Sequence, residues 1–240
     1  MGVKKHLLIL ALGATGTNAI VDQLLNNSHV YKYKKGEKEP LNLRLEEDVR
    51  EGNITWKKQI SNLVEKAQGK ILIIHVQPQH FEELGVSMKE VVSYLKDDFD
   101  FIFMRRRNYL AQKSSHAFKH LWRDFGHGYK KRKAKINAPL LVSNFKYRKR
   151  IEGDIKEAIK EHKHIILIYE KHVQKNPRTG ADMIAKHFGF YENYKYKRVR
   201  NHYHAKKNKW SDVTLAKKIK NFNEVKKVLI KTKYKWMLWE

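Results

Sequence analysis

Short apolar runs alternate along this chain with stretches whose apolar residues recur every three or four positions. The runs cover Leu7 to Leu12, Ile71 to Val76, Phe99 to Met104 and Ile165 to Tyr169. Each run is too short to cross a bilayer and is typical of a strand buried on both faces of a parallel sheet. Strands that alternate with helices predict an α/β fold of three layers, with a central parallel sheet of about four to five strands.

Boundary residues mark where the predicted helices begin. Thr55 precedes an apolar stripe that starts at Trp56, Ser87 precedes one at Val91, and Asn176 precedes Pro177. Threonine, serine and asparagine cap helix N-termini with their side-chain oxygens, and proline fits the first helical turn. Pro139 opens a further long helix whose face carries Leu141, Phe145, Ile151, Ile155 and Ile159.

A loop rich in small residues follows the first predicted strand, with the sequence GATGTNA from Gly13 to Ala19. Gly13 and Gly16 permit a tight turn and close approach of a ligand, and Thr17 or Asn18 is a suitable cap for the helix that follows. The free N–H groups of such a helix attract phosphate. The spacing fits a nicotinamide-dependent Rossmann loop, a 5'-phosphosulfate loop, or a plain turn without ligand, and it lacks the lysine of a Walker-type P-loop.

Three consecutive arginines stand where the third predicted strand meets the next helix, at positions 105–107. Open α/β sheets bind ligands at the carboxyl ends of their strands. An arginine triplet is also typical of a solvated turn, so its position alone leaves both interpretations open.

Charge is the strongest compositional signal, because 51 Lys and Arg against 25 Asp and Glu give a formal net charge of +26. This charge favours anionic partners: nucleic acid bound without sequence preference, a nucleotide with several charges, or a polyanionic glycan. Solubility alone also accounts for lysines scattered along the chain.

The absence of cysteine excludes disulfides and cysteine-ligated metal. His116 and His120 have the spacing of a zinc-binding helix, but no third ligand is indicated, so we expect no metal.

The length of 240 residues predicts one domain over residues 1–240, with mobile basic segments near 31–53, 126–138 and 191–209. The basic start MGVKKHLLIL runs into the glycine loop instead of a cleavage site, so we expect neither a signal peptide nor a membrane span, and a cytoplasmic location. No pattern indicates an oligomeric state.

The stretch FIFMRRRNYLAQKSSHA, residues 101–117, resembles the 3'-phosphate-binding segment of sulfotransferases that use 3'-phosphoadenosine 5'-phosphosulfate (PAPS). In that family an arginine at the strand end and a helix serine eight residues later hold the 3'-phosphate. Arg107 and Ser115 have this spacing, with Arg106 and Ser114 as the pair one register earlier. A guanidinium offers forked, charge-assisted donors to a phosphate dianion, and the serine hydroxyl adds another donor.

The glycine loop is similar to the 5'-phosphosulfate loop of the same family, which is a basic residue followed by Ser-Gly-Thr-Thr. Thr15, Gly16, Thr17 and Asn18 fall on those four positions, directly after Gly13 and Ala14. Ala14 stands at the basic position, where the family's cation neutralises charge on the leaving phosphate. Either a lysine from the basic segments takes this role, or the protein binds nucleotide without efficient transfer.

Two further segments match the family in the same order along the chain. ILIIHVQP, residues 71–78, resembles the Lys-Thr-His-Leu-Pro pattern, which implies that His75 is the general base for the acceptor hydroxyl, although Ile73 replaces the lysine. Residues 167–190 resemble the strand-Tyr-Glu segment, which implies that Tyr169 lies against the adenine. A structural histidine and a core tyrosine are the alternatives.

The resemblance predicts a sulfotransferase that moves a sulfuryl group from PAPS to an acceptor hydroxyl and releases 3',5'-adenosine bisphosphate (PAP). Residues 217–229, KKIKNFNEVKKVL, resemble the end of bacterial glycan sulfotransferases, which implies a carbohydrate acceptor. Arg198, Arg200, Lys206 and Lys207 are candidates for a late nucleotide-binding loop. The alternatives are an NAD(P)-binding Rossmann reductase, although no ribose-binding strand follows the first helix, and a basic nucleic-acid-binding protein.

Overall fold

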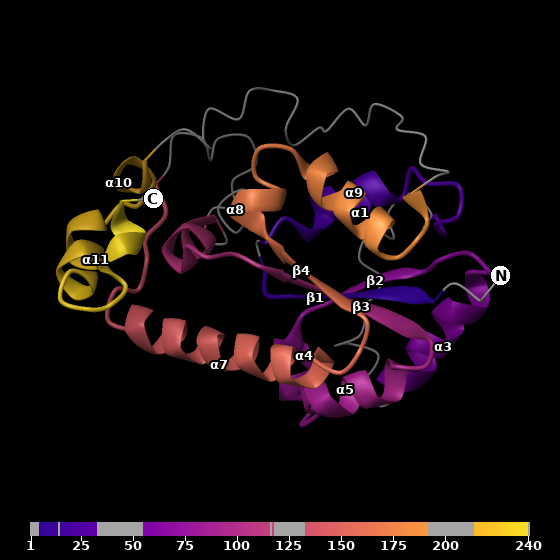
Figure 1. Ribbon diagram of the computed structural model, residues 1–240. Helices are drawn as coiled ribbons and strands as arrows, with labels where there is room; N and C mark the ends of the chain where they lie inside the picture. The colour runs from indigo at the N-terminus through magenta and orange to yellow at the C-terminus, as the bar shows by residue number, and fades with distance from the viewer. Residues whose placement is uncertain are drawn as a thin grey trace. The chain divides into compact units, whose positions relative to one another are not determined.

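Four parallel strands form one sheet in the computed structural model, which describes residues 5–13, 15–32, 55–115, 117, 133–191 and 214–239. The strands are β1 (His6–Ala11), β2 (Ile73–Val76), β3 (Phe99–Arg105) and β4 (His164–Ile168), in the order β2-β1-β3-β4. Helices flank the sheet on both faces (Figure 1). The predicted α/β fold with a central parallel sheet is therefore confirmed.

The chain divides into two compact units. The first comprises Met1–Arg105 and Glu152–Val199 and contains the sheet; the second comprises Arg106–Ile151 and Arg200–Glu240. The boundaries follow β3 and cut the long helix α7 (Leu141–Ile159). The prediction of a single domain over the whole chain stays a prediction.

Strand β1 lies at the centre of the first unit, between β2 and β3. Leu8 pairs with Ile74 on one side and with Phe101 on the other, and Ala11 pairs with Met104. The β1 residues from Leu7 onward are buried, as expected for a strand covered on both faces. The chain enters β2 on one side of β1 and β3 on the other, so the carboxyl end of β1 is a topological switch point, where open α/β sheets bind ligands.

Helices α1 (Thr17–Leu24) and α9 (Pro177–His187) pack on one face of this sheet, where Leu7, Ile9 and Ala11 form a cluster with side chains of both helices. Gly180 lies where these helices meet, since a Cβ there would lie 2.7 Å from Ile20 Cδ1 and 3.0 Å from the His172 carbonyl oxygen. The opposite face carries α3 (Trp56–Lys66), α4 (Pro78–Glu83) and α5 (Met88–Leu95) (Figure 1).

Three of the predicted helix starts have the expected caps. The side chains of Thr55 and Asn176 accept hydrogen bonds from the N–H groups of Lys58 and Arg178. Ser87 and Glu90 form a reciprocal capping box at the start of α5. Local sequence signals therefore determine these helix starts.

The second unit has its own core, in which the last described segment of the chain takes part. Among the described residues, this unit contains a helical stretch that begins at Tyr109, the first part of α7, α10 (Leu215–Lys218), α11 (Phe222–Leu229) and the 3-10 helix η3 (Lys235–Leu238). The ring of Phe145 packs between Tyr109 and Tyr234, with centroid distances of 5.7 and 5.2 Å. Residues 133–138 join this core, since Ala134 pairs with Ile219 and Ile136 N donates to Asn221 Oδ1.

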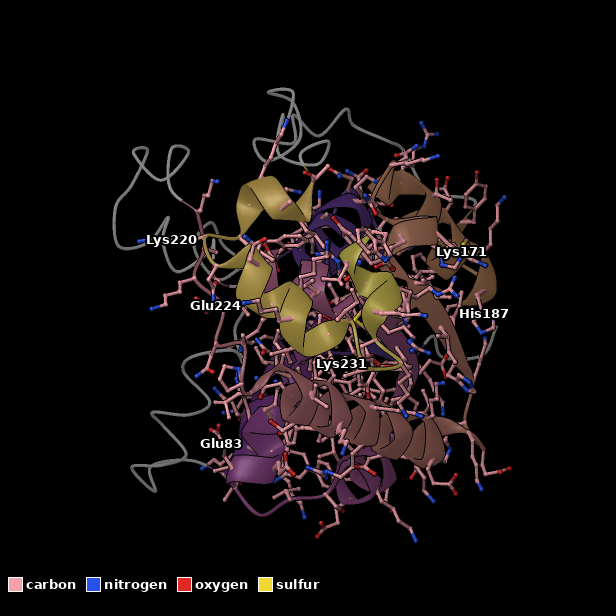
Figure 2. The ribbon with its side chains drawn as sticks, turned by 90° about the vertical axis from the view of Figure 1, so that its left-hand side faces the viewer. Glu83, Lys171, His187, Lys220, Glu224 and Lys231 are labelled. Atoms are coloured by element: carbon pink, nitrogen blue, oxygen red, sulfur yellow. The ribbon has the colours of Figure 1, made fainter. Side chains whose placement is uncertain are left out.

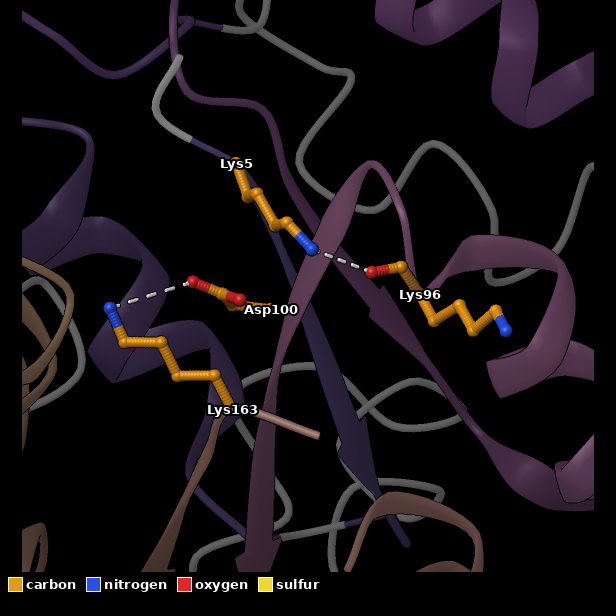
Figure 3. Close-up of polar contacts among 4 residues, drawn as sticks. All are labelled: Lys5, Lys96, Asp100 and Lys163. Carbon is orange, nitrogen blue, oxygen red and sulfur yellow. Dashed lines mark hydrogen bonds and ion pairs between the residues drawn. The ribbon is translucent and has the colours of Figure 1, made fainter. Parts of the chain in front are cut away.

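The amino-terminal edge of the sheet is held by lysines (Figure 3). Lys5 Nζ donates to the Lys96 carbonyl oxygen at 2.8 Å, and Lys163 Nζ lies 4.0 Å from Asp100 Oδ2. Burial raises the pKa of the Asp100 carboxyl, and the two lysines oppose this shift. These contacts lie at the edge opposite to the carboxyl ends of the strands, so they stabilise the sheet without occupying the candidate site.

Two histidines accept backbone hydrogen bonds and must be uncharged at the accepting nitrogen. His6 Nδ1 accepts from Leu72 N at 3.1 Å, and His172 Nδ1 accepts from Ile168 N at 3.0 Å. Burial lowers the pKa of both side chains from the ordinary value of 6.5. Asp98 partly opposes the shift at His6, whereas Lys171 adds to the shift at His172.

These lowered pKa values predict that stability decreases in mild acid. The contribution is fully present above the unfolded-state pKa of 6.5 and declines below it, because the unfolded chain then binds more protons. Melting temperatures recorded by circular dichroism should therefore fall between about pH 7 and 5.5. In the double variant His6→Asn, His172→Asn, the amide oxygens accept the same bonds without titrating, so this part of the decline should disappear. An identical decline in the variant would contradict the assignment.

Candidate nucleotide site

Gly16 forms the turn between β1 and α1 in a left-handed conformation, with φ 80° and ψ 18°. It is the N-cap residue of α1, and no side chain caps the helix there. The prediction that Thr17 or Asn18 caps the helix is therefore wrong. The turn needs a positive φ at its last residue, which glycine adopts readily, so the helix begins one residue earlier than a threonine cap allows.

The side chains of this loop differ in their exposure. Thr15 is buried, and its hydroxyl oxygen has no hydrogen-bond partner among the described residues. Thr17 is also buried, Gly13 is half-buried, and Asn18 is exposed. Ala14 lies outside the described residues. A buried hydroxyl beside a helix start without a side-chain cap is an arrangement that suits an anion.

Tyr169 joins the loop from the end of β4, as the first residue of the short helix α8 (Tyr169–His172). A Cβ on Gly16 would lie 2.9 Å from Tyr169 Cε2 and 3.0 Å from Val173 Cγ1. The tyrosine ring therefore packs directly on the glycine of the turn, and Tyr169 is half-buried against the cluster on this face. Its predicted contact with an adenine stays a prediction.

His75 is the third residue of β2 and is half-buried. It pairs with Ile9, whereas the turn begins after Ala11, so His75 lies two residues before the end of β1 in the register of the sheet. Its predicted role as a general base is not tested by this position.

The three arginines after β3 have three different surroundings. Arg105 ends β3, and its Nη2 lies 2.8 Å from the Glu152 carboxylate, which is buried. Glu152 was not identified from the sequence, although an acidic residue on the apolar face of a predicted helix, beside Ile151 and Ile155, is a recognisable signal. Arg105 therefore has a structural role within the first unit, which leaves Arg106 and Arg107 as the candidates for a ligand.

Arg106 and Ser115 lie side by side in the second unit. Arg106 Nη1 donates to Ser115 Oγ at 3.1 Å, and Ser115 Oγ donates to the Ala111 carbonyl oxygen at 2.8 Å. Arg107 is exposed, whereas Ser114 is buried. Of the two candidate serines, Ser115 is therefore the one on the accessible side of its helix, and it contacts the arginine that the spacing had paired with Ser114.

Asn108 fixes the start of this helix and was not identified from the sequence. Its Oδ1 accepts from Ala111 N at 2.9 Å, and its Nδ2 donates to the Met237 carbonyl oxygen at 3.2 Å. The first bond is an N-cap, which an asparagine just before a helical stretch indicates. The second is a long-range contact that no local pattern shows, and it anchors the segment that includes η3.

The described residues contain no group of three or more His, Asp or Glu side chains arranged to hold a metal ion. His116 and His120 lie outside the described residues, as do Arg198, Arg200, Lys206 and Lys207. In the described part of the chain, no helix has both the length and the apolar character that crossing a membrane requires.

Neither a family model nor a curated protein matches this chain. Among solved structures, it is similar to the sulfotransferase domain from the Synechococcus PCC 7002 olefin synthase, with 15% sequence identity and a TM-score of 0.47. The similarity covers 82% of this chain and 79% of that domain. A likeness of this degree identifies no activity.

The packing of Tyr169 on Gly16 predicts a large effect of Gly16→Ala. Gly69 is a matched control, because its φ of 76° is similar and nothing lies within 4 Å of the position that a Cβ would take there. We expect Gly69→Ala to lower the free energy of unfolding by about 1 kcal/mol, from the left-handed conformation alone. Gly16→Ala should lose about 1–3 kcal/mol more, because the methyl group overlaps the tyrosine ring. Equal losses in chemical denaturation would show that the contact is unimportant.

Proposed function

We propose that this protein is a sulfotransferase that uses PAPS and sulfates a hydroxyl group, on a carbohydrate acceptor. The observation that carries the proposal is the β1–α1 turn, where the buried Thr15 hydroxyl stands next to a helix start without a side-chain cap. The order of the other motifs supports it: His75 in the second strand, Arg107 and Ser115 after the third, and Tyr169 after the fourth.

The turn suits the 5' end of the donor. The first N–H groups of α1 and the Thr15 hydroxyl are donors for phosphate and sulfate oxygens, and the helix dipole favours negative charge. Gly16 has no side chain, and the Tyr169 ring packs against the turn at this position. The proposed interaction is between an anionic ligand and uncharged hydrogen-bond donors, namely the Thr15 hydroxyl and the backbone N–H groups.

The residues after β3 suit the 3'-phosphate. Arg106 and Arg107 supply two guanidinium groups, and Arg106 already positions the Ser115 hydroxyl. Two cations match the two charges of a phosphate monoester, and forked donors bind its oxygens in pairs. ATP and NAD carry no phosphate monoester on the ribose, so this group favours a PAPS-type nucleotide over those two. NADP carries one at the 2' position, so binding of PAP and of NADP has to be compared directly.

In the proposed reaction the acceptor oxygen attacks the sulfur of PAPS and forms the new S–O bond. The bond from sulfur to the phosphate oxygen breaks, PAP leaves, and the imidazole of His75 takes the hydroxyl proton. In-line positioning and donors at the leaving phosphate lower the barrier without a metal. Ala14 supplies no cation at the leaving group, so backbone donors and lysines elsewhere carry this charge.

The nucleotide assignment predicts that PAP raises the melting temperature of the protein. Arg107→Ala and Ser115→Ala should each weaken binding about tenfold or more, because each removes a donor to the 3'-phosphate, which Ser115 provides once its hydroxyl turns away from the Ala111 carbonyl oxygen. Arg178→Ala is the matched control, since Arg178 is an exposed arginine whose Nε lies 3.8 Å from Asp182 Oδ2 on α9. It should bind PAP normally. Titration calorimetry measures the dissociation constant of PAP for the wild type and for the three variants.

Two other ligands test the alternatives in the same assay. Stabilisation by NADP without stabilisation by PAP would contradict the sulfotransferase proposal and favour a reductase. Stabilisation by a random oligonucleotide alone, with a steep dependence on salt, would favour a nucleic-acid-binding protein.

The proposed base predicts that His75→Ala lowers turnover about 10²–10⁴-fold while PAP binding is retained. The loss arises because no group then takes the proton of the acceptor hydroxyl. His80→Ala, in the neighbouring helix α4, is the control and should keep its rate. Release of PAP from PAPS in the presence of sugar acceptors provides the measurement. Full activity of His75→Ala would exclude it as the base.

A further inference from the structure

Large apolar side chains are exposed at the end of the second unit. Trp239 is 68% exposed, Ile230 is 46% exposed and Trp236 is 37% exposed. Single exposed apolar side chains are normal on soluble proteins, whereas several that lie together mark an interaction site.

The four side chains of Lys226, Ile230, Trp236 and Trp239 form one surface, here called the tryptophan surface. Lys226 Nζ lies 5.5 Å from the centroid of the Trp239 ring. Ile230 N donates to the Lys226 carbonyl oxygen at 2.9 Å, so residues 226 and 230 are one helical turn apart on the same face. Trp239 N bonds to the Trp236 carbonyl oxygen at 3.2 Å in a 3-10 turn, which places residues three apart above one another.

The tryptophan surface is fixed by the core beneath it. Met237 and Leu238, between the two tryptophans, are buried, and Tyr234 packs on Phe145. The Met237 carbonyl oxygen accepts the bond from Asn108. Tyr234, Met237 and Leu238 are therefore the residues of this segment that pack into the core. The two tryptophans lie outside that core.

Positive charge predominates in the segment that carries the tryptophan surface. The described residues 214–239 contain a single acidic side chain, Glu224, whose carboxylate accepts a hydrogen bond from Asn221 Nδ2. Their lysines are Lys217, Lys218, Lys220, Lys226, Lys227, Lys231, Lys233 and Lys235. Figure 2 shows Glu224 near the start of α11 and Lys231 beyond its end. The surface is therefore complementary to an anionic partner.

We propose that the tryptophan surface docks the protein on an anionic lipid bilayer. Tryptophan is the side chain most typical of the membrane–water interface, and lysines beside it attract acidic headgroups. The Lys226 ammonium group lies over the Trp239 ring, so a cation and an aromatic side chain are presented together on this surface. Lysines alone suit nucleic acid or a sulfated glycan equally well, but the aliphatic Ile230 gains from burial only against lipid or protein.

The test measures cosedimentation with vesicles of phosphatidylcholine alone and of phosphatidylcholine containing about one quarter phosphatidylserine. We expect binding to the second kind only, with a blue shift of tryptophan fluorescence. The double variant Trp236→Ser, Trp239→Ser should reduce binding more than tenfold, and so should Lys231→Glu, Lys235→Glu. Leu140→Ser is the matched control, because Leu140 is an apolar residue of the same unit that is 52% exposed, and this variant should bind normally.

Unchanged PAP binding in the tryptophan variant separates this inference from the proposed function and reports that the protein is folded. Absence of binding to phosphatidylserine vesicles would overturn the inference. So would equal binding by the wild type and by both double variants. Binding to heparin or to an oligonucleotide that depends on the two tryptophans, without vesicle binding, would assign the surface to a polyanion instead.

Discussion

The close packing around Gly16 is the constraint on which the candidate site depends. β1 is buried on both faces and paired with a strand on each side. The chain is therefore free to turn only beyond the carboxyl end of β1. A left-handed glycine turns it directly into α1, and Tyr169 and Val173 fill the space that a side chain would take. On the same face, Gly180 brings α9 against Ile20 of α1. The shape of a loop near the start of the chain is therefore determined by residues more than 150 positions later, and rigid backbone donors are what an anion site requires.

The arginine triplet shows how a strongly basic chain divides its charges. Arg105, whose side chain is 26% exposed, and the buried Glu152 neutralise each other at 2.8 Å, so loss of Arg105 would leave a buried carboxylate without its cation. Arg106 is turned toward Ser115, and Arg107 is exposed. Arg105, which links β3 to α7, is therefore distinct from the two arginines proposed to bind phosphate. The charge of Arg105 is balanced by Glu152, so its neutralisation does not require a bound anion.

Local signals were sufficient to predict most of the fold. The strands follow from short apolar runs, and Thr55, Ser87 and Asn176 cap the helices that their positions indicate. Contacts between residues distant in sequence were not predictable. The spacing of arginines and serines does not reveal that Glu152 pairs with Arg105, that Ser114 is buried, or that Asn108 reaches Met237. The cap at Gly16 was missed because Thr17 and Asn18 are better side-chain caps by residue type, and the contact of Tyr169 with Gly16 comes from a residue far away in the sequence.

Ala14 makes the charge balance at the proposed leaving group unusual. A lysine at that position supplies a full positive charge, whereas the N-terminus of a helix supplies roughly half a charge that weakens within the first turn. Under the proposed function, the helix start and Thr15 attract the donor phosphate but stabilise the charge that develops in the transition state less well. Binding and transfer then depend on different residues: we propose that the turn and the arginine–serine pair bind the nucleotide and that cations outside β1 and α1 set the rate.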